Sequence, residues 1–270
     1  MCTVSMIAMG AGDTRGGSRS PRLRIVVNRD EERERPPAIP PRWHELEDAA
    51  GRPCGRAIWP IDPLGGGTWV GASERGLALL LLNGNPEPRP VRPCADRVLS
   101  RGGIIPLLIG RAGVDDAVAG ALGGLIEFEC YPAFRLVAAE PGLVRSVEWD
   151  GREARVAEHD PRACCFVSSG LGDRCVAVRL PLFDEMVRAD PTPANQDRFH
   201  AHRWADRPEL SVMMSRSAAR TMSVTTVEVG AAAEEAGDVR AGASAAMWYR
   251  PVNEPVRVPT ERVPPPRAKN

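Results

Sequence analysis

Two apolar segments near the start of the chain have the composition of β-strands. The segments Thr3 to Met9 and Arg22 to Asn28 are rich in Val, Ile and Met, and a polar, glycine-rich connection separates them. Two strands joined in this way favour a hairpin, which would bring Cys2 close to the start of the Asn28 to Asp30 segment at one sheet edge. The next residues, Glu31 to Pro63, are charged and proline-rich and predict a long loop.

The middle of the chain combines a glycine-bordered hairpin with a helical pattern. The segments Gly65 to Gly71 and Gly76 to Leu82 predict two strands that turn at Ser73 to Arg75. From Cys94 to Leu125, apolar and small residues recur at helical spacing, with a break near Ala112. We therefore expect two helices on one face of a sheet.

The second half of the chain returns to strands in blocks rather than in alternation with helices. The predicted strands are Phe134 to Glu140, Val144 to Trp149, Ala154 to Glu158, Ala163 to Val167, Met222 to Val229 and Ala243 to Trp248. The predicted helices are Val176 to Arg188 and Asn195 to Trp204. This order lacks the regular strand–helix alternation of a parallel sheet. It predicts an α+β fold in which two antiparallel sheets are sandwiched between layers of helix.

Length and charge fit a single domain followed by a tail. The chain has 270 residues, of which 43% are hydrophobic, which is enough for one core. We expect the domain to span residues 1–253 and the proline-rich residues 254–270 to form an extended or disordered tail.

Basic and acidic residues number 35 each, so no global field draws the chain to nucleic acid or to an anionic membrane. The longest apolar runs are far shorter than the roughly 20 residues of a membrane span. Oligomeric state is left open.

The cysteine and histidine spacings give no metal or cofactor signal. Seven cysteines form no C-x-x-C pair, and an odd number of thiols favours a reduced, cytoplasmic protein. His200 and His202 are two residues apart on a predicted helix, so they point to different sides. The glycine-rich run at Gly65 lacks the lysine and the strand-to-helix setting of a phosphate loop. We therefore expect neither a metal nor a cofactor.

Cys2 is the first residue with candidate chemistry. A small residue after Met1 favours removal of the initiator methionine, which would give Cys2 both a thiol and a free α-amine. The thiolate is the reactive form, and an α-amine with a pKa of roughly 7.7–8.0 suits a general base near neutral pH. A residue of this kind brings its own base. The alternative interpretation is a cysteine that is simply buried in a strand.

The polar residues Asn28, Arg29, Asp30 and Glu31 follow an apolar Ile-Val-Val run. Polar and charged groups at the end of a buried strand need partners. Asp30 could hold an ammonium group, and Arg29 could hold a carboxylate or polarise a thiol. Glu31 begins a run of charges, and we interpret it as part of a solvated loop.

Asn83 and Trp69 border the glycine-rich hairpin. Asn83 closes a wholly apolar strand, where its amide could donate a hydrogen bond to an oxyanion. The alternative is a turn-forming residue before Gly84. For Trp69, a place in a glycine-bordered strand favours a role in the core over a role as a ligand platform.

Taken together, these blocks resemble a known family. Met1-Cys2, the Asn28 to Glu31 tetrad, Gly66 to Gly71 and Gly76 to Ala78 occur in the order typical of the NRDE family, which includes the transport and Golgi organisation protein 2 group. Weaker similarities follow at Ser100-Arg101-Gly102 and at Ala219 to Ser223. They extend the resemblance over most of the chain.

The spacing also resembles the cysteine N-terminal-nucleophile hydrolases of the choloylglycine hydrolase and penicillin V acylase type. That resemblance implies a four-layer αββα fold and cleavage of non-peptide amides. It implies Cys2 as nucleophile, with its own amine as base and with Arg29 at the site. It further implies that Asp30 orients the amine, that Asn83 contributes to an oxyanion site and that Arg220 is a late basic site residue.

Two positions depart from the acylase pattern. The acylases place their arginine three residues before the aspartate, where this chain has Val27. They also have an asparagine near the strand matched by residues 166–170, where this chain has Ser168 and Ser169. We expect Asn28, Trp69 and Ser169 to be binding residues of the site.

Two functions follow from the resemblance. The first is hydrolysis of the amide bond of a small molecule through a Cys2 thioester. The second is a non-catalytic binding or trafficking protein of the transport and Golgi organisation type that handles haem or a lipid.

Overall fold

Two antiparallel sheets form the centre of the molecule. The computed structural model describes residues 2–10, 21–48, 50–86, 97–230 and 245–252. The smaller sheet has five strands in the order β10-β1-β2-β11-β12, and the larger has seven in the order β3-β4-β5-β6-β7-β8-β9. The strands are β1 (Cys2–Met9), β2 (Arg22–Glu32), β3 (Ile39–Glu47), β4 (Pro53–Ile61), β5 (Val70–Ser73), β6 (Ala78–Asn83), β7 (Phe134–Glu140), β8 (Leu143–Trp149), β9 (Ala154–His159), β10 (Ala163–Ser168), β11 (Ala219–Gly230) and β12 (Ala245–Pro251).

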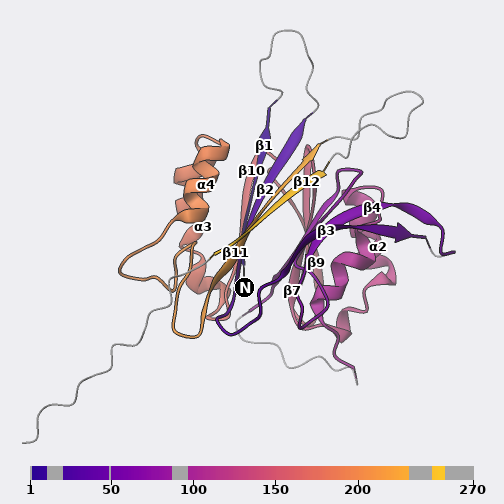
Figure 1. Cartoon of the computed structure of the whole chain (residues 1–270), viewed down its shortest axis with the longest axis horizontal. Coiled ribbons are helices and arrows are strands. Elements are labelled where there is room, and N and C mark those ends of the chain that lie inside the picture. Colours follow the sequence, from indigo (N-terminus) through magenta and orange to yellow (C-terminus); the bar gives the residue numbers. More distant parts are fainter. Residues whose placement is uncertain (1, 11–20, 49, 87–96, 231–244, 253–270) are drawn as a thin grey trace, which may run out of the picture.

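Short helices cover the outer faces of both sheets. The α-helices are α1 (Ile104–Leu108), α2 (Val114–Gly120), α3 (Arg179–Phe183) and α4 (Pro193–Ala201). Short 3₁₀ or π turns adjoin them: η1 (Arg101–Gly103), η2 (Ala121–Leu125), η3 (Phe128–Cys130), η4 (Asp173–Val176) and η5 (Asp184–Arg188). In Figure 1, α3 and α4 lie outside the smaller sheet and α2 lies outside the larger one. The predicted α+β sandwich of two antiparallel sheets between helix layers is confirmed.

Three apolar clusters separate the four layers. The cluster between the sheets takes alternate residues of β1 and β2, such as Val4 and Val27, and alternate residues of β6, such as Leu80. The other face of β6, including Leu79, packs with α1 and α2. On the far side of the smaller sheet, Ile7 packs with helix residues. The central strands of both sheets are therefore covered on both faces, which explains why strands such as β6 read as continuous apolar runs.

The predicted hairpin of β1 and β2 is present, but β2 is longer than expected. It continues through the charged residues to Glu32, because β11 pairs with it along this stretch and Thr221 stands opposite Asp30. The predicted meander is also present as β7, β8 and β9. The hairpin predicted around Ser73 is present as β5 and β6, but its first strand begins at Val70 rather than at Gly65.

The long loop predicted for Glu31 to Pro63 is wrong. Most of that segment forms β3 and β4, which pair antiparallel. β3 is an edge strand and most of its residues are exposed. Pro40 and Pro41 fall where the register with β4 is interrupted between Ile39 and Arg42, so their missing N–H groups break no regular ladder. Proline and charge are compatible with an edge strand as well as with a loop.

The predicted helices are shorter and more irregular than their patterns indicate. The segment expected as one helix up to Arg188 is divided into α3 and the π turn η5. The next helix begins at Pro193, because the side chain of Thr192 caps it by accepting a hydrogen bond from the backbone N–H of Asn195. The predicted tail at 254–270 lies outside the described residues. None of the helices described here is long and apolar enough to cross a membrane.

Candidate active site

Cys2 is the first residue of β1, in the interior of the smaller sheet. It stands in register with Arg29 of β2 on one side and with Ser168 of β10 on the other. Its side chain is buried and forms part of the wall of a cavity of about 290 Å³. The remaining wall comes from the end of β2 and, across the space between the sheets, from residues 62–69, 81–83 and 100–102. Both sheets therefore contribute to the surroundings of the thiol.

The setting of Cys2 keeps its thiol protonated. Burial raises the pKa of this thiol, and the carboxylate of Asp30 adds to the rise, while Arg29 acts in the opposite direction. A thiol with a raised pKa is a weak nucleophile at neutral pH. Any reaction at Cys2 therefore needs a base that takes its proton.

Asp30 is buried behind the cavity, on the helix-facing side of β2. The hydroxyl of Thr221 donates to Asp30 Oδ1 at 2.6 Å, and Nη1 of Arg179 lies 3.6 Å from Asp30 Oδ2. Arg179, from α3, also donates to Oγ1 of Thr3 at 2.6 Å. Burial raises the pKa of the Asp30 carboxyl, and the contacts with Arg179 and Thr221 oppose that rise. The carboxylate is thus fixed in place by two neighbouring elements.

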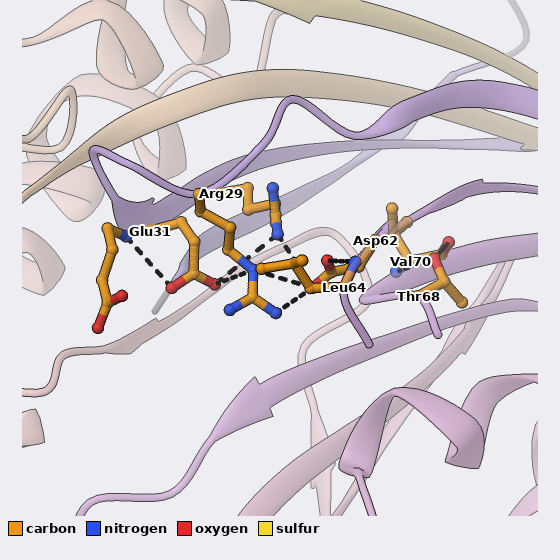
Figure 2. A network of polar contacts seen from close by, with 8 residues as sticks. Arg29, Glu31, Asp62, Leu64, Thr68 and Val70 are labelled. Carbon is orange, nitrogen blue, oxygen red and sulfur yellow. Dashed lines mark hydrogen bonds and ion pairs between the residues drawn. The ribbon is translucent and has the colours of Figure 1, made fainter. Parts of the chain in front are cut away.

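Arg29 projects into the cavity and joins a cluster of charged groups (Figure 2). Its Nη2 donates to Oδ2 of Asp62 at 3.2 Å and lies 3.8 Å from Oε2 of Glu31. Arg35 donates to the same Asp62 oxygen, from Nε at 3.1 Å and also from Nη2. The Arg29 guanidinium lies over the ring of Trp69, 4.4 Å from its centroid. These contacts hold the guanidinium next to Cys2.

Asn83 and Arg101 belong to the opposite wall of the cavity. Asn83 is the last residue of β6 and lines the cavity together with Leu81. The side-chain amide of Asn83 has no hydrogen-bond partner among the described residues, so it is available to a ligand. Arg101 is anchored by a hydrogen bond from its Nη1 to the carbonyl of Ala133 at 2.8 Å.

Close backbone contact positions this wall. Gly67 and Gly102 touch so tightly that a Cβ on Gly67 would lie 2.4 Å from the carbonyl carbon of Gly102. The backbone N–H of Thr68 donates to the Gly102 carbonyl at 3.0 Å. The glycine-rich run predicted as part of a hairpin therefore also lets two loops meet at the cavity.

Asn28 lies away from the cavity, on the helix-facing side of β2. Its Nδ2 donates to the carbonyls of His200 and Val212, both at 2.9 Å, and its Oδ1 contacts Nδ1 of His200 at 2.9 Å. The other ring nitrogen of His200 contacts the hydroxyl of Ser5 at 2.7 Å. Burial lowers the pKa of His200 to about 3, so the ring is neutral. These contacts give Asn28 a supporting position rather than one in contact with a ligand.

Ser169 and Arg220 also lie outside the cavity wall. Ser169 follows β10, where its hydroxyl accepts from the N–H of Leu171 and its N–H donates to Asp173. Arg220 stands opposite Glu31 at the start of β11, beside a bulge. Of the eight residues predicted for the site, four therefore line one cavity: Cys2, Arg29, Trp69 and Asn83.

Several residues of the site escaped prediction. Glu31 and Arg35 were expected in a solvated loop, yet both line the cavity. Asp62 and Arg179 gave no sequence signal for a role in the site, because their partners Arg29 and Asp30 are distant in sequence. The Ser100-Arg101-Gly102 motif was the one available indication for Arg101.

Comparison with known proteins gives similarity at the level of fold. No family model matches the chain, and no curated protein matches it. Among solved structures, penicillin V acylase from Agrobacterium tumefaciens is 10% identical, with coverage of 84% of this chain and 83% of that chain and a TM-score of 0.44. The Caenorhabditis elegans ortholog of N-acylethanolamine-hydrolyzing acid amidase is 11% identical, with coverage of 92% and 100% and a TM-score of 0.45. A variant of conjugated bile acid hydrolase from Clostridium perfringens is 11% identical, with coverage of 95% and 99% and a TM-score of 0.44. These structural neighbours are of the N-terminal-nucleophile-hydrolase type.

Proposed function

We propose that this chain is a hydrolase that cleaves the amide bond of a small molecule through a thioester on Cys2. The observation that carries the proposal is the grouping around one cavity of the buried Cys2 thiol, the guanidinium of Arg29 in register with it, and the fixed carboxylate of Asp30 behind. A nucleophile, a cation and an orienting carboxylate are the groups that acyl transfer uses.

The proposed reaction begins with transfer of the Cys2 thiol proton to the α-amine of the same residue. The sulfur attacks the carbonyl carbon of the amide, and the side-chain amide of Asn83 donates to the oxyanion that forms. As the C–N bond breaks, the ammonium returns its proton to the leaving nitrogen. Water then hydrolyses the thioester, which releases the acid and restores the thiol.

The surrounding residues take supporting roles in this proposal. Asp30 orients the ammonium, and Arg29 stabilises negative charge at the sulfur and at the oxyanion. Arg220 is proposed as a basic residue at the edge of the site, next to Glu31. Asn28 and Ser169 hold the strands that carry the reacting groups.

The motifs shared with the NRDE family support the proposal that the chain is a member of that family. The same resemblance raises the alternative of a protein that handles haem or a lipid. Charged and polar side chains make up most of the cavity wall, with Leu81 and Trp69 as its large apolar members. Haem and lipids need extended apolar surface, so this wall favours a small polar substrate.

Intact mass and thiol labelling test the proposal at its first step. The purified protein should lack Met1, and Cys2 should react with a thiol reagent at neutral pH despite its burial. Cys164 serves as an internal control, because burial raises its pKa to about 12 and it should stay unlabelled. A retained Met1 together with an unreactive Cys2 would contradict the proposal.

Turnover tests the second step. Incubation with a panel of short-chain N-acyl amino acids and short-chain N-acylethanolamines should release free amine, and Cys2→Ser should lower the rate by about 10³-fold or more. The matched control is Cys175→Ser, which changes an exposed thiol that is not among the cavity-lining residues. Equal rates for the wild type and Cys2→Ser would refute catalysis by Cys2.

A further inference from the structure

The cavity beside Cys2 holds an excess of positive charge. Three guanidinium groups line it, from Arg29, Arg35 and Arg101, against the two carboxylates of Glu31 and Asp62. Asp62 accepts hydrogen bonds from Arg29 and Arg35, and Glu31 lies 3.8 Å from Arg29 and 3.7 Å from Arg35. Both carboxylates are thus engaged with the same two arginines.

Arg101 is the cation that remains. It donates to a backbone carbonyl, and within the described part of the chain no carboxylate lies at ion-pair distance from it. A largely buried guanidinium that makes no direct ion pair, and has only the more distant charge of Glu31 near it, is a ready partner for an anion that enters the cavity.

Two buried donors in the same wall have no partner either. Nη1 of Arg29 and Nε1 of Trp69 make no hydrogen bond to any described residue, although both side chains are more than nine-tenths buried. A buried donor without an acceptor costs about 1–3 kcal/mol, so such groups are normally satisfied by a ligand or water. Both donors belong to residues that line the cavity, but each nitrogen has less than 1 Å² of accessible surface, so a ligand would reach it only after a small shift of the side chain.

We infer that the substrate of this site is a small amide that carries a carboxylate, which Arg101 binds, next to the buried and unpartnered N–H groups of Arg29 and Trp69. This inference rests on the proposed function. A carboxylate presents two planar acceptor oxygens that match a guanidinium, and it would neutralise the excess charge. A volume of about 290 Å³ restricts the ligand to a small molecule.

Binding to an inactive protein tests the carboxylate directly. The Cys2→Ala variant is titrated by calorimetry with two matched pairs: N-acetylglycine against N-acetylglycinamide, and succinamate against succinamide. The first pair has the carboxylate on the amine side of the amide and the second on the acyl side. We expect the carboxylate member of at least one pair to bind at least tenfold more tightly than its neutral partner. Equal affinities in both pairs, or tighter binding of inorganic phosphate than of either carboxylate, would overturn the inference.

Variants of Arg101 assign the effect to this residue. In the Cys2→Ala background, Arg101→Gln should weaken carboxylate binding at least tenfold, while Arg101→Lys should retain part of it. Arg56→Gln is the matched control, because Arg56 pairs with Glu74 and lies outside this cavity. Thermal unfolding confirms that each variant is folded. Unchanged binding by folded Arg101→Gln would contradict the assignment.

Hydrolysis assays separate this inference from the proposed function. Cleavage of neutral and carboxylate-bearing amides at equal kcat/KM would uphold the hydrolase and refute the carboxylate preference. Carboxylate binding that depends on Arg101, without cleavage of any amide by the wild-type protein, would refute the hydrolase and leave the anion site standing.

Discussion

Strand β2 distributes its polar residues between two environments. Because side chains alternate along a strand, Arg29 and Glu31 point toward the cavity, whereas Asn28 and Asp30 point toward the helix layer. The residues on the helix-facing side are fully buried and meet side chains from α3 and α4. One contiguous polar motif thus supplies both the side chains that line the cavity and the side chains that anchor β2 to the helix layer.

The ion pair of Asp30 and Arg179 is expected to couple strongly. Each side chain is 1% exposed, so loss of one partner leaves an uncompensated buried charge. We expect Arg179→Met to lower the free energy of unfolding by about 3–5 kcal/mol. A double-mutant cycle with Asp30→Asn, measured by urea denaturation, should give a coupling free energy of about 1–3 kcal/mol. Additive effects of the two substitutions would show that the two charges do not interact.

The residues that could be predicted from the sequence are those with a local signal. Cys2, Arg29 and Asp30 follow or precede apolar strands, where a polar side chain stands out. Arg179 gave no such signal, because its position in a helical segment is typical of a solvated arginine. Only the packing of α3 on the smaller sheet, which depends on residues far apart in sequence, buries it.

At the scale of elements, two loops determine the shape of the cavity. The loop before β5 and the turn η1 before α1 meet at Gly67 and Gly102, and Arg101 extends from the second of them. The contact is made by backbone atoms, which cannot move aside as a flexible side chain can. A side chain at either glycine would push the two walls apart.

Gly67→Ala should therefore be destabilising. We expect a loss of about 1–3 kcal/mol in the free energy of unfolding, as for other overpacked sites. Gly103→Ala is the matched control in the adjoining turn, because a Cβ there meets nothing within 4 Å and φ is −77°. Denaturant titration of both variants provides the measurement. Equal stability of the two would argue against the close backbone contact.

Strand and helix boundaries show which elements a local pattern can predict. The β7 to β9 meander was predicted closely, because its strands alternate and are joined by short turns. β3 and β4 were missed, because the prolines and charges that an edge strand tolerates are also those of a loop. Pairing of β4 with β5 is what distinguishes this segment from a loop, and a local sequence pattern carries no information about that pairing.

At the scale of the whole molecule, a directional hydrogen-bond network joins the smaller sheet to α4. Arg24 donates to Oε1 of Gln196, and Nε2 of Gln196 donates to Oγ of Ser5. The Ser5 hydroxyl is then free to donate to Nε2 of His200, whose Nδ1–H donates to Oδ1 of Asn28. This order of donors and acceptors requires a neutral histidine.

The network makes the stability of the fold sensitive to acid. Burial lowers the pKa of His200 to about 3, whereas the unfolded chain has a histidine pKa of about 6.5. Between these values the unfolded state binds a proton that the folded state does not, so stability is full above pH 6.5 and falls as the pH is lowered. From pH 7 to pH 5 we expect this group alone to remove about 2 kcal/mol from the free energy of unfolding.

Urea denaturation at the two pH values measures the total change, and proton NMR isolates the contribution of His200. Its ring protons should show no titration between pH 8 and pH 5. A His200 midpoint near 6.5 would mean that the ring accepts a proton without loss of the fold. The contacts of His200 with Ser5 and Asn28 would then have to rearrange, because a doubly protonated ring cannot accept the Ser5 hydroxyl proton.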